Sequence, residues 1–73
     1  MLVKVIYNQH FDVPYYLQLG FDKNGNLKEL HDIMFDSDVL KFYDSGITKN
    51  NCLQFVLKGF PLGCVAKIIK QNN

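Results

Sequence analysis

The chain has 73 residues and a formal net charge of +1 at neutral pH, and 48% of its residues are hydrophobic. This length accommodates one small domain, and the apolar content suffices for a core without disulfides or metals. No apolar run reaches the ~20 residues of a membrane-spanning helix and no signal peptide opens the chain, so we expect a cytoplasmic protein with no membrane partner.

Charge is unevenly spread along the chain. Residues 22–44 carry six acidic residues and three lysines, whereas residues 45–73 carry four lysines and no acidic residue. All basic residues are lysines, which argues against bidentate recognition of guanine or phosphate. We interpret the asymmetry as a solvated surface. The arginine-free composition, rich in Asn and Lys, suits a protein from an AT-rich bacterial, phage or other viral genome.

The first third of the chain predicts a β-hairpin. Residues 1–7 are rich in β-branched side chains and predict one strand, and the alternating residues 15–22 predict its partner. A polar loop over residues 8–14, ending at Pro14, connects them. The residues of these two strands that are predicted to pack against the helix are Val3, Val5, Leu17 and Leu19.

The segment at residues 27–35 allows two interpretations. It follows an Asn-Gly pair within a turn at residues 22–26, which favours a second hairpin and therefore a strand. Asn26 lies three residues before Glu29, and this spacing can instead form a capping box at the start of a helix. Helical spacing is also found among its apolar residues, Leu27, Leu30, Ile33 and Met34. We predict a helix over residues 27–35.

Two further strands are predicted near the end of the chain. The β-rich residues 39–43 predict a short strand, and a helical turn capped by Ser37 is the alternative. A turn at residues 60–63 precedes the last strand, at residues 64–70.

The run at residues 52–57 is predicted to be the central strand. It follows a turn at residues 47–51, and Gly46 supplies a left-handed position before that turn. Leu53, Phe55 and Leu57 alternate with the other residues of the run, which gives one fully apolar face.

Together these elements predict a single α+β domain over residues 1–70. One amphipathic helix packs on one face of a small sheet of four to five strands, which is mostly antiparallel or mixed. The alternative is an OB-like five-stranded barrel with an inserted helix. Residues 71–73 are expected to form a frayed tail.

Residues 44–57, DSGITKNNCLQFVL, resemble the end of ubiquitin-like β-grasp domains. That family has an Asp, a left-handed residue before an Ile, a Lys two positions on, and then Leu and Val-Leu at matching spacing. The matching residues are Asp44, Gly46, Ile47, Lys49, Leu53, Val56 and Leu57. The initial order of two strands and a helix also matches. The resemblance implies a β-grasp fold, and it implies that Val56 corresponds to a valine in the family's exposed binding patch.

No combination of residues predicts catalysis or cofactor binding. Structural zinc sites use ligands in close pairs, whereas more than ten residues separate each candidate here from the next; the candidates are His10, His31, Cys52 and Cys64. Both cysteines lie in apolar runs and are expected to be reduced and buried. The sequence has no glycine-rich phosphate loop and no nucleophile in a signature context. We therefore expect no enzyme, no metal and no cofactor.

The outward face of the predicted sheet is the candidate binding site. An apolar patch with a lysine rim is typical of a surface that binds another protein. The predicted contact residues are Leu2, Lys4, Ile6, Tyr16, Val56 and Lys58. We therefore predict a protein-binding module, an adaptor or inhibitor, that acts through a sheet face or an edge strand as a monomer or homodimer. The alternative is nucleic-acid binding through the lysines of the last two strands.

Overall fold

The computed structural model describes residues 1–6, 15–43 and 45–71. The predicted loop at residues 8–14 lies outside the described residues, as do Tyr7, Asp44 and residues 72–73. The elements, in chain order, are β1 (Leu2–Ile6), β2 (Tyr15–Phe21), β3 (Leu27–Asp32), β4 (Ser37–Asp38), the 3₁₀ helix η1 (Leu40–Phe42), α1 (Cys52–Leu57) and β5 (Val65–Lys70).

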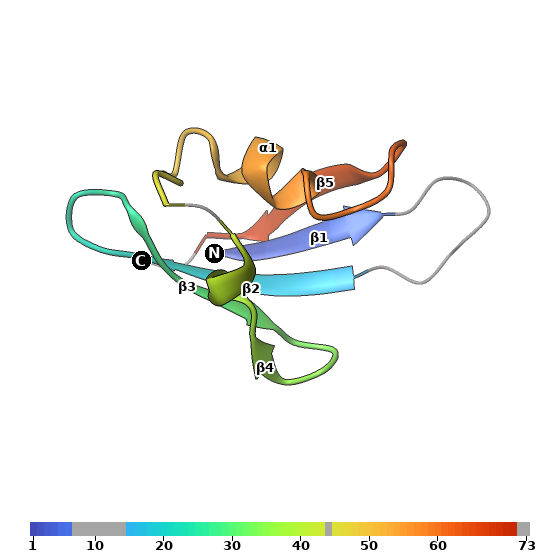
Figure 1. Ribbon diagram of the computed structural model, residues 1–73, viewed down its shortest axis with the longest axis horizontal. Coiled ribbons are helices and arrows are strands. Elements are labelled where there is room, and N and C mark those ends of the chain that lie inside the picture. The colour runs from blue at the N-terminus through green and yellow to red at the C-terminus, as the bar shows by residue number, and fades with distance from the viewer. Residues whose placement is uncertain (7–14, 44, 72–73) are drawn as a thin grey trace.

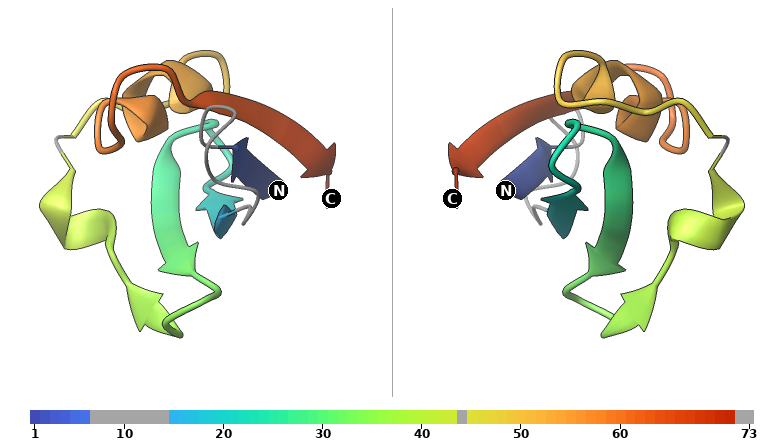
Figure 2. Two further views of the ribbon diagram at one scale, coloured as in Figure 1. Left: turned by 90° about the vertical axis from the view of Figure 1, so that its right-hand side faces the viewer. Right: turned by 90° about the vertical axis from the view of Figure 1, so that its left-hand side faces the viewer.

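The five strands form one antiparallel sheet in the order β4-β3-β2-β1-β5 (Figure 1). This arrangement, with one short helix, confirms the predicted α+β class. The described strands form an open sheet with β4 and β5 at its edges, and not the closed barrel that was the alternative. Figure 2 shows the sheet strongly curved, with α1 lying across one end of the curve.

The predicted hairpin of the first two strands is confirmed. β1 and β2 pair in antiparallel register, with Val3 opposite Leu17. The inward row is sealed from solvent, since Val3 and Val5 are 0% exposed and Leu17 is 2% exposed. Cys52 and Val56 of α1 pack against these residues in the same core cluster. One face of the sheet is therefore covered by the rest of the chain.

The prediction of a helix at residues 27–35 is wrong, because β3 occupies Leu27–Asp32. Phe21 pairs with Leu27 whereas Gly20 pairs with Glu29, so Lys28 is an extra residue in a β-bulge. The bulge brings Leu27 and Leu30 to the same face although they are three residues apart. The bulged strand thus explains the helical spacing of these apolar residues. The alternative interpretation, a second hairpin with an Asn-Gly turn, is correct.

The hairpin turn before β3 is stabilised by Asp22. Its Oδ1 atom accepts hydrogen bonds from the backbone N–H groups of Asn24, at 2.8 Å, and Asn26, at 2.9 Å. Gly25 has a φ of +83°, which a side chain would strain. The N–H of Asn26 is the largest cause of a lowered pKa of the Asp22 carboxyl, because it favours the charged form.

The predicted central strand at residues 52–57 is also wrong, because this run forms the helix α1. A helix places residues four apart on one face, and Cys52 and Val56, at 1% and 0% exposure, form its buried face. Over six residues, alternation and helical periodicity are hard to tell apart in an apolar run. The chain enters α1 through a turn in which Asn51 Oδ1 accepts a hydrogen bond from the Thr48 N–H at 2.7 Å.

The weakly patterned residues 39–43 form no strand. Val39 still donates its N–H to the Leu30 carbonyl of β3, at 2.9 Å, and η1 then begins at Leu40. The Leu40 N–H donates to Asp38 Oδ1 at 3.0 Å. The helical turn that was the alternative is therefore correct, and its side-chain hydrogen bond comes from Asp38 and not from Ser37. The last predicted strand is confirmed as β5.

Candidate functional site

Four of the six predicted contact residues share the outer face of the sheet, which we call the open face. Leu2, Lys4 and Ile6 alternate with buried residues of β1, and Tyr16 precedes the buried Leu17. All four side chains are partly buried. Lys4 lies directly between Tyr16 on β2 and Lys67 on β5. The first hairpin therefore brings this part of the predicted site together as expected.

The other two predicted contact residues do not lie on the open face. Val56 is 0% exposed in the core cluster, so its predicted exposure is wrong. Lys58 follows α1 on the covered side of the sheet, where its Nζ atom lies 4.3 Å from the centroid of the Phe55 ring. Both errors have one cause, since residues 52–57 form a helix that packs on the covered face instead of a strand.

Strand β5 adds residues that the predicted contact set lacked. Lys67 lies opposite Lys4, and Val65 lies opposite Ile6. Val65 is 52% exposed and Ile69 is 50% exposed. No described strand pairs with the outer edge of β5. Alternation in the sequence predicts that Val65 and Lys67 share the face of Lys4 and Ile6, and Ile69 lies where the β1–β5 register shifts.

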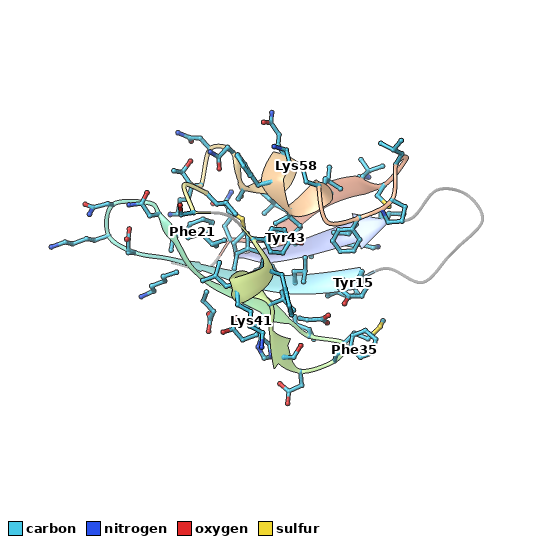
Figure 3. All side chains as sticks on the ribbon, viewed as in Figure 1. Tyr15, Phe21, Phe35, Lys41, Tyr43 and Lys58 are labelled. Atoms are coloured by element: carbon cyan, nitrogen blue, oxygen red, sulfur yellow. The ribbon has the colours of Figure 1, made fainter. Side chains whose placement is uncertain are left out.

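A cavity of about 480 Å³ lies on the opposite, covered side, between the sheet, the η1 region and α1. Aromatic side chains dominate its lining: Tyr15, Phe42, Tyr43, Phe55 and Phe60. Figure 3 shows Tyr15 on β2, Tyr43 after η1, and Lys58 after α1. Tyr15 and Phe60 pack edge to face, with ring centroids 5.3 Å apart. The cavity is thus built from segments that are distant in the sequence.

Polar groups at three points face this aromatic cavity. Asp32, at the end of β3, is 3% exposed and accepts hydrogen bonds from the Tyr15 hydroxyl and, at 3.1 Å, from the Phe35 N–H. The Tyr43 hydroxyl donates to the Val56 carbonyl at 3.4 Å, and burial raises the pKa of this phenol. Among the residues that the structure describes, Lys58 supplies the only cation in the lining.

Gly59 allows Tyr43 to approach α1. A Cβ atom at residue 59 would lie 2.5 Å from the Tyr43 hydroxyl oxygen, which is closer than real contacts allow. The glycine therefore leaves room for the Tyr43 wall of the cavity. In the sequence, Gly59 is not distinguished from the predicted turn at residues 60–63 that follows it.

In the folded protein we expect an alkylating reagent to modify Cys64 well before Cys52. Cys52 is 1% exposed, and burial raises the pKa of its thiol, so the reactive thiolate is scarce at neutral pH. Cys64 is only partly buried, which corrects the expectation of two buried thiols. Mass spectrometry of timed alkylation measures both rates, and urea should equalise them. Equal rates in the native protein would contradict the packing of α1.

The described residues contain no group of three or more His, Cys, Asp or Glu side chains placed to hold a metal ion. His31 instead pairs with Asp36, with 2.9 Å between Nε2 and Oδ1, and His10 lies outside the described residues. Within the same described part of the chain, no helix is long and apolar enough to cross a membrane.

No protein-family model, curated protein or solved structure matches the chain. The relationship to ubiquitin-like domains that residues 44–57 suggest therefore stays a prediction. Part of that segment, residues 52–57, is the helix α1 and not the strand that its alternation predicted. The implied exposure of Val56 does not hold for this buried residue.

Proposed function

We propose that this chain is a small non-enzymatic protein-binding module, an adaptor or inhibitor. It captures an extended segment of another protein along the outer edge of β5 and on the adjoining open face. The single observation that carries this proposal is β5 itself, a six-residue edge strand with exposed apolar side chains and no described strand on its outer side.

An edge strand offers a row of backbone donors and acceptors to an added strand. Main-chain hydrogen bonds then supply affinity, and side chains that alternate along the strand supply specificity. The other edge strand, β4, has only two residues and offers far less. Val65 and Ile69 flank Lys67 on β5, so an added segment would meet apolar and basic positions in turn.

The charge of this surface favours an acidic partner. Lys67 lies beside Lys4, and Lys70 lies at the end of the same strand. Two copies paired through β5 would bring lysine rows together, and like charges on neighbouring strands are destabilising. Acidic side chains on the added segment would instead be attracted to this surface. The expected partner is therefore a different protein with alternating acidic and apolar residues.

Selection of displayed random peptides on the wild-type protein tests this proposal. We expect the selected peptides to alternate acidic and apolar residues. Ile69→Asp or Lys67→Glu should weaken their binding by about tenfold or more, as expected for central interface positions. Leu62→Asp is the matched control, because Leu62 is 99% exposed but lies in the turn before β5. Equal effects of all three substitutions, or none, would contradict the proposal.

Binding of single-stranded nucleic acid is the second candidate function. It is favoured by the position of Lys4 between Tyr16 and Lys67, since lysines beside an aromatic ring can hold a phosphate backbone and stack a base. Fluorescence anisotropy with mixed-sequence oligonucleotides separates the two functions. Affinity that falls steeply with salt and is lost in Lys4→Glu would support the nucleic-acid function instead.

A further inference from the structure

The cavity on the covered face has the composition of a ligand site, independently of the open face. Its volume of about 480 Å³ lies within the range of small-molecule sites, roughly 300–1,000 Å³. Its walls present aromatic rings from β2, from the η1 region and from the α1 region. Such rings carry partial negative charge on their faces, and they therefore attract cations as well as apolar groups.

Asp32 adds an anionic group to these walls. It is the only buried polar or charged residue among the described core positions, at 3% exposure. Each carboxyl oxygen accepts one hydrogen bond, Oδ2 from the Tyr15 hydroxyl and Oδ1 from the Phe35 N–H. A carboxylate has about four acceptor positions, so it can accept more. Within the described residues, the one side-chain ion pair is His31–Asp36, and Asp32 has no cationic partner.

Lys58 shows that the aromatic wall accepts a cation. Its ammonium nitrogen lies 4.3 Å from the centroid of the Phe55 ring, within the ~6 Å range of a cation–π contact. The Lys58 side chain is solvent-exposed, so its ammonium group can move into water and leave the ring face free. An external cation would then gain both the rings and the Asp32 carboxylate.

We propose that this cavity binds a small organic ammonium ligand, with the cationic group between the aromatic rings and the Asp32 carboxylate. An alkylated ammonium suits the site because its methyl groups pack on the rings while its charge remains. Within the described part of the chain, an anionic ligand would have Lys58 as its only cationic contact in the lining, and it would face the buried carboxylate. A neutral apolar ligand would make no use of Asp32.

Titration of the full chain with choline tests the proposal by ¹H–¹⁵N NMR. The control is the uncharged isostere of choline, in which carbon replaces the ammonium nitrogen. We expect saturable shifts at the amides of Tyr15, Asp32 and Tyr43, and about tenfold weaker binding of the isostere. Equal binding of both compounds, shifts confined to other regions, or no saturable shift with choline would overturn the proposal.

Two substitutions, each of which removes a charge of opposite sign, show whether the site prefers a cationic ligand. Asp32→Asn should weaken choline binding by about tenfold, whereas Lys58→Met should strengthen it or leave it unchanged, because it removes a competing ammonium group. Weaker binding in Lys58→Met would overturn the proposal. Because Asp32→Asn also removes a hydrogen-bonded carboxylate from the end of β3, Phe42→Ala provides a second variant. Phe42 lines the cavity and is 75% exposed, so its loss should weaken binding without unfolding the chain.

Discussion

Val56→Asp should unfold the domain. Val56 is 0% exposed between α1 and the sheet, so an aspartate there would be a buried charge without a partner. Such a charge costs about 3–5 kcal/mol, which is a large part of the stability of a domain this small. Circular dichroism and thermal denaturation measure the loss directly. We expect no cooperative transition at room temperature or above.

Gln54→Asp is the matched control for this substitution. Gln54 lies on the same helix but is exposed, and exposed substitutions usually change stability by less than about 0.5 kcal/mol. A folded Val56→Asp variant with a melting temperature near that of Gln54→Asp would show that Val56 does not face the core. The assignment of residues 52–57 to α1 would then have to be abandoned.

Leu30→Ala should destabilise the domain by about 2–5 kcal/mol, the usual cost of truncating a buried leucine. Leu30 is 0% exposed on β3, whereas Ile33 and Met34 are 45% and 49% exposed beyond the strand. We expect Ile33→Ala and Met34→Ala to cost much less than Leu30→Ala. Urea denaturation of the three variants measures the differences. Similar losses at all three positions would instead support the helical face that the spacing of these residues first suggests.

The strands that the sequence predicts correctly, β1, β2 and β5, are rich in β-branched or aromatic side chains. In β2, Leu17 and Leu19 alternate with Gln18 and Gly20, and β1 pairs with β2 in an unbroken register, so both strands and their faces could be assigned. One extra residue, Lys28, breaks the alternation of β3 and imitates a helix. The six residues of α1 alternate like a strand by chance, and only their packing against the core distinguishes the two.

Of the candidate sites, the open face could be predicted from the sequence and the cavity could not. The hairpin of β1 and β2 makes the shared face of four residues predictable: Leu2, Lys4, Ile6 and Tyr16. The aromatic cavity could not be predicted, because its walls come from segments whose contacts only the fold creates. Asp32 carried no signal either, since an acidic residue in an acidic stretch ordinarily indicates solvent exposure and here it occupies an inward position of β3.

The pairing of β5 with β1 has a consequence for the order of folding. The β1–β2 and β2–β3 pairs join neighbours in sequence, whereas the β1–β5 pair joins the first and last strands of the chain. Closing so long a loop costs more chain entropy than closing either hairpin, so we expect β5 to dock last and to detach first. Its backbone amides should therefore exchange with solvent faster than those of β2. The strand proposed to bind a partner is thus also the strand that a partner can displace most easily. A bound segment would hold β5 in place and so raise the unfolding barrier of the whole sheet.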